Sequence, residues 1–170
     1  VAAIIAARLE ANVVLVEKEY IGGTCLNWGC IPTKALLKTA ETLESIKKSS
    51  EYGVEASVSS IIIANAVSRK DRIVKSLKIG LESLLSNPKI TILMGEGLIE
   101  TSNKVKVQVD EETIIVDCDK LIITSGSKTL IPSITGMDLD AVITSNEAIN
   151  LTEIPESMTI IGAGAIGLEF

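Results

Sequence analysis

Histidine is absent from this 170-residue chain, and aromatic side chains are scarce, with one Trp, two Tyr and one Phe. Acidic residues outnumber basic residues by 22 to 16, which gives a formal charge of −6. Nucleic-acid binding needs clustered cations, and single strands also need aromatic stacking faces, so the composition argues against a nucleic-acid partner. No uncharged run approaches the roughly 18 to 20 residues of a membrane-spanning helix. We therefore expect a soluble, cytoplasmic protein without a membrane partner.

Cysteine is also rare, since the chain has three, while 46% of its residues are hydrophobic. This excludes a disulfide scaffold, a collagen-like chain and low-complexity disorder, and it predicts an aliphatic core. The sequence starts at Val1 in the middle of an apolar helical pattern and ends at Phe170 just after a glycine-rich turn. We therefore expect a part of a longer protein, with any targeting peptide outside it.

Hydrophobic periodicity predicts an α/β fold. The expected helices cover residues 1–10, 35–48 (beginning near Cys30) and 61–85, and the expected strands cover 13–16, 90–94, 105–109, 113–116, 120–124 and 158–161. Short continuous runs of β-branched residues are typical of parallel strands buried on both faces, whereas residues 105–109 alternate as a half-exposed antiparallel strand does. We predict a doubly wound parallel sheet with a small inserted antiparallel meander. A domain boundary is expected within residues 128–155, and the end of the chain begins a second nucleotide-binding unit.

A G-x-G-x-x-G pattern at Gly162, Gly164 and Gly167 follows the expected strand 158–161. In a strand, turn and helix context, such glycines allow a tight turn and a close approach of the backbone to a pyrophosphate. The glycines could instead serve only the turn. The acidic residue that would distinguish NAD from NADP is expected about 20 positions later, beyond Phe170.

Glu17 ends the first expected strand, where dinucleotide-binding folds place a carboxylate for ribose hydroxyls. The alternative is a solvated charge at a strand end.

Two cysteines stand five positions apart in residues 22–34, GGTCLNWGCIPTK. Five helical steps rise about 7.5 Å, which exceeds the ~7 Å limit for bridged Cα atoms, so a Cys25–Cys30 bridge needs a distorted turn. Gly29 supplies backbone freedom for that turn. With Pro32 in a first helical turn, Cys30 lies near a helix N-terminus, which favours a thiolate. A reactive dithiol is the favoured interpretation.

Other interpretations of the two cysteines remain open: a structural disulfide, a zinc site, or two inert thiols. A structural zinc site needs four ligands, but apart from this pair the chain has only one further cysteine, Cys118, and no histidine. We expect no metal site, and we regard Cys118 as an incidental thiol.

At residues 22–34 the chain resembles the flavin-dependent pyridine nucleotide-disulfide oxidoreductases, most closely the dihydrolipoamide dehydrogenases of that family. Further motifs that match are Gly95-Glu96-Gly97, Thr124-Ser125-Gly126, Thr144 to Ala148 and the glycines from Gly162. The resemblance implies an FAD-binding domain at residues 1–149, lacking its first strand and glycine loop, and the start of an NAD-binding domain at 150–170.

The resemblance also implies a two-electron relay. Cys25 would exchange with dihydrolipoamide, Cys30 would lie against the flavin as the charge-transfer thiolate, and electrons would pass through FAD to NAD⁺. Lys34 would lie near the flavin ring, although a lysine on a helix surface is the alternative. The implied cofactor-binding residues are Glu17, Lys18, Gly22, Gly23, Thr24, Lys34, Gly97, Ser125, Gly126, Gly162, Gly164, Ile166 and Gly167.

The implied whole protein is a homodimer that serves lipoyl domains and the E2-type core of 2-oxo-acid dehydrogenase complexes, or the glycine-cleavage H protein. Its thiol base would be a histidine–glutamate pair from the partner subunit, which this histidine-free chain lacks. We expect the isolated chain to be inactive. The alternatives are an NADPH-dependent enzyme like glutathione or mercuric reductase, or a non-catalytic flavoprotein or binding module.

Overall fold

The computed structural model describes residues 1–170 and divides them into two compact units. One unit comprises Val1–Gly23 and Leu77–Ser127, and the other comprises Thr24–Ser76 and Lys128–Phe170. The division falls inside the long helix α4 (Ile63–Leu85). No helix is both long enough and apolar enough to cross a membrane.

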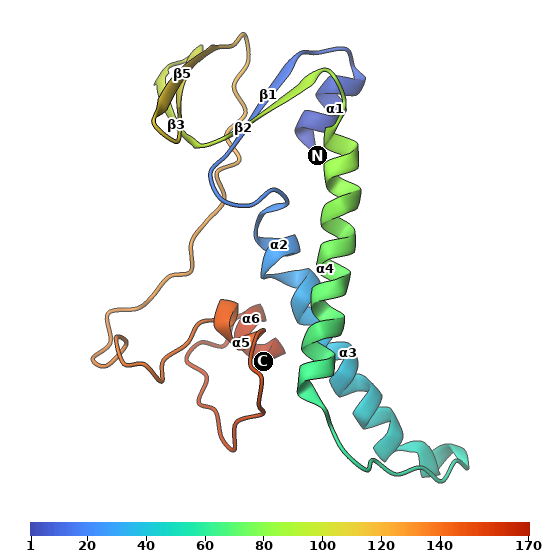
Figure 1. The fold of residues 1–170 in the computed structure, drawn as a ribbon. Helices are drawn as coiled ribbons and strands as arrows, with labels where there is room; N and C mark the ends of the chain where they lie inside the picture. The colour runs from blue at the N-terminus through green and yellow to red at the C-terminus, as the bar shows by residue number, and fades with distance from the viewer. The chain divides into compact units, whose positions relative to one another are not determined.

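The first unit contains a parallel pair of strands with a helix beside it (Figure 1). Its elements are α1 (Ala2–Arg8), β1 (Val13–Glu17), the end of α4, β2 (Ile90–Met94), β3 (Glu96–Thr101), β4 (Lys104–Val109) and β5 (Glu112–Asp117). β1 pairs with β2 in parallel register, from Val13 with Ile90 to Glu17 with Met94. Parallel strands need a long crossover connection, and here the chain between β1 and β2 supplies it.

The core beside this pair is aliphatic, as the composition predicts. Ala7, Leu85 and Ile90 are buried together, and partly buried side chains from α1, α4 and the two strands pack around them. Burial of each large side chain of this kind contributes about 1.5 to 3 kcal/mol to the stability of the fold. α4 ends at Leu85, just before Asn87 and Pro88, because proline excludes the helical conformation from the residue before it.

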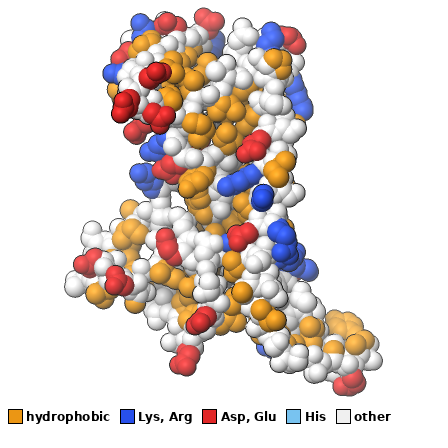
Figure 2. All heavy atoms as spheres, in the orientation of Figure 1, with side chains coloured by type: hydrophobic (Ala, Val, Ile, Leu, Met, Phe, Trp, Pro, Cys, Tyr) orange, Lys and Arg blue, Asp and Glu red, His pale blue; other side chains and the backbone are white.

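Strands β3, β4 and β5 form the inserted antiparallel meander. β4 is its central strand, and Val107, which is fully buried, anchors it. Asp110, at a positive φ of 49°, makes the turn between β4 and β5 that the acidic residues 110–112 predict. On the face that Figure 2 shows, charged side chains surround exposed hydrophobic ones in this part of the molecule. The predicted combination of parallel strands and an antiparallel insertion is therefore present.

The second unit is helical. It contains α2 (Gly23–Asn27, of which Gly23 belongs to the first unit), α3 (Cys30–Lys47), the 3₁₀ helix η1 (Ser49–Tyr52), the beginning of α4, α5 (Ser145–Ala148) and α6 (Ala165–Glu169). The Ala, Leu, Lys and Glu composition of residues 35–48 correctly predicts α3. A capping box formed by Thr144 and Glu147 starts α5.

Two predicted strands are wrong. Residues 120–124 and 158–161 have the apolar pattern of buried strands, but neither joins a ladder. Ile122 and Ile123 are 65% and 68% exposed. A strand requires a neighbour whose backbone groups face its own, and β1 and β2 pair only with each other. Strand β3, which the pattern missed, forms because β4 provides such a neighbour.

Candidate active site

The two cysteines of the sequence motif lie where one helix ends and the next begins. Cys25 belongs to α2, and Cys30 is the first residue of α3. Gly29 stands between the helices. A Cβ on Gly29 would lie 2.8 Å from the Thr24 carbonyl oxygen and 3.0 Å from the Cys25 Cα. Only glycine allows the backbone to approach this closely, so the sharp turn predicted at Gly29 depends on the missing side chain.

Both thiols are free and exposed. Gly29, at the N-cap, has no side chain to satisfy the first-turn donors of α3. α3 therefore begins without a side-chain cap.

The pKa of the Cys25 thiol is raised above its ordinary value. The hydrogen bond to Cys30 is the main cause, followed by burial and by the negative charge of a Cys30 thiolate. The N–H groups of Cys30 and Ile31 act in the opposite direction. Cys30 is the first residue of α3, so the predicted place of this cysteine at a helix N-terminus is present.

Two buried residues complete the first turn of α3. Pro32 is almost fully buried and has no N–H to satisfy. Thr33, which is 7% exposed, donates to the Gly29 carbonyl twice: its hydroxyl lies 2.8 Å away and its N–H 3.1 Å away. Sequence reasoning missed Thr33, whose only signal is its place four residues after Gly29 in a helix.

Lys34 forms an ion pair with Glu169 of α6, with 2.9 Å between Nζ and Oε1. This contact is the main reason why the pKa of Lys34 is raised, and the charges of Cys30 and Cys25 add to it. Lys34 thus lies within electrostatic range of both thiols, although its side chain is 62% exposed. Glu169 was missed, although its position two residues after Gly167 placed it on the helix that the glycine pattern predicts.

The second glycine pattern forms a tight turn before α6. Gly162 has a positive φ of 115°, and Gly164 is the N-cap of α6. A Cβ on Gly167 would lie 2.1 Å from the Gly162 carbonyl oxygen, so no side chain fits there. Ile166, the remaining candidate of the pattern, is 60% exposed.

Three candidate residues of the first unit lie along its sheets. Glu17 ends β1, and its Oε1 accepts a hydrogen bond from the Glu19 N–H at 2.9 Å. Lys18 pairs with Glu96 at 3.6 Å, with both side chains largely exposed. Gly97 packs against β1, because a Cβ there would lie 3.3 Å from a methyl group of Val16.

Of the other candidates, Gly23 is the first residue of α2, whereas Gly22, Ser125 and Gly126 lie in loops. Gly22 and Gly23 have positive φ angles of 107° and 65°, and Gly126 has 71°. Ser125 precedes Gly126 in the unpaired segment after β5. The structure brings Thr24, Cys25, Cys30 and Lys34 together at the start of α3. No group of three or more His, Cys, Asp or Glu side chains is placed to hold a metal ion.

Comparison with known proteins identifies the family. The model of the pyridine nucleotide-disulphide oxidoreductases matches residues 1–170. The chain belongs to this family.

The similar proteins include dihydrolipoyl dehydrogenases. That of Chlorobaculum parvum is 40% identical over 172 residues, which cover 99% of this chain and 36% of the relative. That of Acholeplasma laidlawii is 41% identical over 175 residues, covering 100% of this chain and 51% of the relative. The chain thus spans between about a third and a half of the length of these relatives.

A solved structure with the same fold is the HOCl-induced flavoprotein disulfide reductase RclA from Escherichia coli. It matches with a TM-score of 0.80 and 27% identity over 98% of this chain and 35% of that chain. A Cu(II) complex of a cysteine-to-serine mutant of the same reductase matches with a TM-score of 0.81. The family resemblance and the fold class inferred from the sequence are thereby confirmed.

Proposed function

We propose that this member of the pyridine nucleotide-disulphide oxidoreductase family carries the redox-active dithiol of a dihydrolipoamide dehydrogenase. The observation that supports this most directly is the pair of exposed thiols, Cys25 at α2 and Cys30 at the start of α3, on either side of the close turn at Gly29. Similarity to dihydrolipoyl dehydrogenases, at about 40% identity across the chain, supports the choice of substrate.

The chemistry begins with the Cys25–Cys30 disulfide. A thiolate of protein-bound dihydrolipoamide attacks the sulfur of Cys25, and Cys30 leaves as a thiolate. The second thiol of the substrate then attacks the mixed disulfide, which releases lipoamide and leaves both cysteines reduced. Two electrons and two protons have passed from the substrate to the enzyme. When bound, FAD would accept these electrons from the dithiol and NAD⁺ would take them as a hydride.

The residues present fit these two cofactors. Glu17 provides a carboxylate at the C-terminal end of a parallel strand, where it can accept hydrogen bonds from ribose hydroxyls. Gly22 and Gly23, just before Cys25 in the sequence, have positive φ angles and are exposed, so their backbone is accessible to a cofactor. The turn before α6 has the glycine-dependent geometry of a pyrophosphate-binding loop, because Gly162 has a positive φ of 115° and no side chain fits at Gly167.

Several other residues complete the proposal. Lys34 would tune the flavin by its charge, with Glu169 holding the ammonium in place. Residues 1–149 would form the FAD-binding domain and 150–170 the start of the NAD-binding domain. The further cofactor-binding residues in this proposal are Lys18, Thr24, Gly97, Ser125, Gly126, Gly164 and Ile166.

We further propose that the enzyme acts as a homodimer in the cytoplasm. Its partners would be lipoyl domains and the E2-type core of a 2-oxo-acid dehydrogenase complex, or the H protein of glycine cleavage. Similarity to dihydrolipoyl dehydrogenases is the support for these partners.

The test uses the longest product of the gene, supplied with FAD. With dihydrolipoamide and NAD⁺, we expect NADH to form, and we expect Cys25→Ser and Cys30→Ser each to abolish its formation. Cys118→Ser is the matched control, because Cys118 is a third thiol outside the pair and should be dispensable. Activity that survives loss of Cys25 or Cys30 would contradict the relay.

An NADPH-dependent reductase of another disulfide or of mercuric ion is the second candidate, because the fold also matches a flavoprotein disulfide reductase. The same preparation should be assayed with NADPH and either oxidised glutathione or Hg²⁺. Turnover in those assays, with none on dihydrolipoamide, would favour this second function.

A further inference from the structure

Gly29 contacts both sides of the dithiol turn, which is the break between Cys25 in α2 and Cys30 in α3. On one side, Gly29 abuts the backbone of Thr24 and Cys25, with 3.0 Å between its ideal Cβ position and the Cys25 Cα. On the other side, its carbonyl oxygen accepts two hydrogen bonds from Thr33. Any movement of Gly29 therefore changes the position of Cys25 relative to α3.

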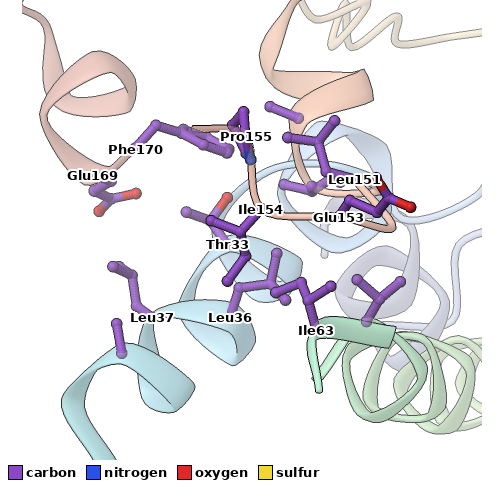
Figure 3. A pocket seen from close by; sticks show the side chains of 14 residues that line it. Thr33, Leu36, Leu37, Ile63, Leu151, Glu153, Ile154, Pro155, Glu169 and Phe170 are labelled. Atoms are coloured by element: carbon purple, nitrogen blue, oxygen red, sulfur yellow. The ribbon is translucent and has the colours of Figure 1, made fainter. Parts of the chain in front are cut away.

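Thr33 is built into this turn. It is 7% exposed, and its side chain lies on the face of α3 that also carries Leu36 and Leu37 and lines an apolar cavity of about 220 Å³ (Figure 3). A buried hydroxyl needs a partner, and at 2.8 Å the Gly29 carbonyl oxygen is one. The hydroxyl is thereby held on one acceptor.

Two other side chains of α3 make the same type of bond to the carbonyl four residues earlier. Thr42 donates to the Lys38 carbonyl at 2.7 Å, and Ser45 donates to that of Glu41 at 2.8 Å, both on exposed surface. Both of these bonds join residues that lie farther along α3, away from its first turn. The bond of Thr33 differs because its acceptor is the N-cap carbonyl, next to the helix break.

We propose that Thr33 is a positioning residue that keeps Cys25 and Cys30 at the separation needed to form their disulfide. This role rests on the proposed dithiol function and adds a specific residue to it. Thr33 touches neither sulfur, and it acts through the carbonyl of Gly29. Without the hydroxyl, the reduced turn can open, so the second thiol meets the first less often and the intramolecular disulfide becomes less favourable.

The experiment measures the equilibrium between the Cys25–Cys30 pair and glutathione in the full 170-residue chain. Cys118→Ser is the background, so that only the two thiols of interest react. The chain is equilibrated in glutathione buffers of increasing oxidation, the thiols are trapped by alkylation, and the two forms are counted by mass spectrometry. Circular dichroism checks that each variant remains helical.

Thr33→Val keeps the shape and removes the hydroxyl, and we expect it to lower the equilibrium constant about five-fold, the effect of one net hydrogen bond. Thr33→Ser keeps the hydroxyl and should remain within about two-fold of the background. Thr42→Val is the matched control on the same helix and should also remain within about two-fold.

The outcomes separate two kinds of failure. If the background chain forms no Cys25–Cys30 disulfide in any buffer, the proposed function itself is wrong. If it forms the disulfide but Thr33→Val leaves the constant unchanged, or Thr42→Val lowers it equally, the role of Thr33 is wrong. If Thr33→Val does not fold, Thr33→Ser decides the question. A folded serine variant whose disulfide equilibrium constant is about five-fold lower than that of the background would overturn the proposal, and an unchanged constant would support it.

Discussion

Replacing Gly29 by alanine tests how the dithiol turn is built. The added Cβ would lie 2.8 Å from the Thr24 carbonyl oxygen, 3.0 Å from the Cys25 Cα and 3.2 Å from the Thr24 carbonyl carbon. All three are backbone atoms, so no side-chain rotation can relieve the contact. Overpacking of this kind costs about 1 to 3 kcal/mol. We expect Gly29→Ala to lower the free energy of unfolding by about 2 kcal/mol.

The same substitution should also weaken the dithiol. The strain is relieved if α2 moves away from α3, which separates the Cys25 and Cys30 sulfurs, whereas the disulfide form holds them together. If all of about 2 kcal/mol acts in this way, the equilibrium constant for the disulfide falls about 30-fold. The assay is urea unfolding followed by circular dichroism, combined with equilibration in glutathione buffers.

Gly80→Ala is the control, because Gly80 lies inside α4 and nothing is within 4 Å of its ideal Cβ position. Alanine stabilises a helix interior by about 0.8 to 1 kcal/mol relative to glycine, so the control should be more stable than the parent chain. The two substitutions should thus have opposite signs. A Gly29→Ala chain as stable as the Gly80→Ala chain, with an unchanged disulfide constant, would refute this account of the turn.

Three further substitutions test other parts of the second unit. Glu169→Gln should bring the raised pKa of Lys34 back toward 10.5, which an NMR titration measures. The ion pair contributes stability that is present below pH 10.5 and is lost as the pH rises through the raised pKa, and the substitution should remove this contribution. An unchanged titration of Lys34 would contradict the pairing. Thr144→Ala should cost about 1 kcal/mol in urea unfolding near neutral pH. The pKa of Glu147, which hydrogen bonds from Thr144 lower, should then rise toward 4.5. In the parent chain the Glu147 carboxylate contributes stability above pH 4.5 that is lost as the pH falls through its lowered pKa, and this contribution should become smaller in the variant. Lys70→Met should lower the free energy of unfolding by about 2 kcal/mol, because Lys70 is 2% exposed and its three bonding partners would lose the ammonium group that they contact. An unchanged midpoint of urea unfolding would contradict this prediction.

Local features of this chain could be predicted from the sequence. The composition of residues 35–48 identifies α3, and Asn87-Pro88 marks the end of α4, because helix propensity and the restriction before proline act within a few residues. The turn at Gly29 could also be predicted, since the spacing of the two cysteines requires a break. These predictions depend on neighbours in the sequence, which are known before any fold is.

Pairing across the chain could not be predicted in the same way. The apolar run 120–124 has the composition of a buried strand as clearly as residues 90–94 do, yet only the latter forms one, opposite β1. The difference lies in whether a partner strand is present, which a single segment does not encode. For the same reason the family motif pointed to Lys34 but not to Glu169, whose contact with Lys34 crosses 135 positions.

The first turn of α3 shows how these local and distant effects combine at the site. An α-helix begins with N–H groups that lack intrahelical partners, and a serine, threonine or aspartate at the N-cap usually accepts from them. Here the N-cap must be Gly29, because any Cβ would strike the backbone of α2. The N–H groups of Cys30 and Ile31 act on Cys25 instead and lower the pKa of its thiol, although the hydrogen bond to Cys30 and burial outweigh them and raise it. The close approach that forbids an ordinary cap is thus also what brings the backbone of α2, which carries Cys25, against the start of α3, which carries Cys30.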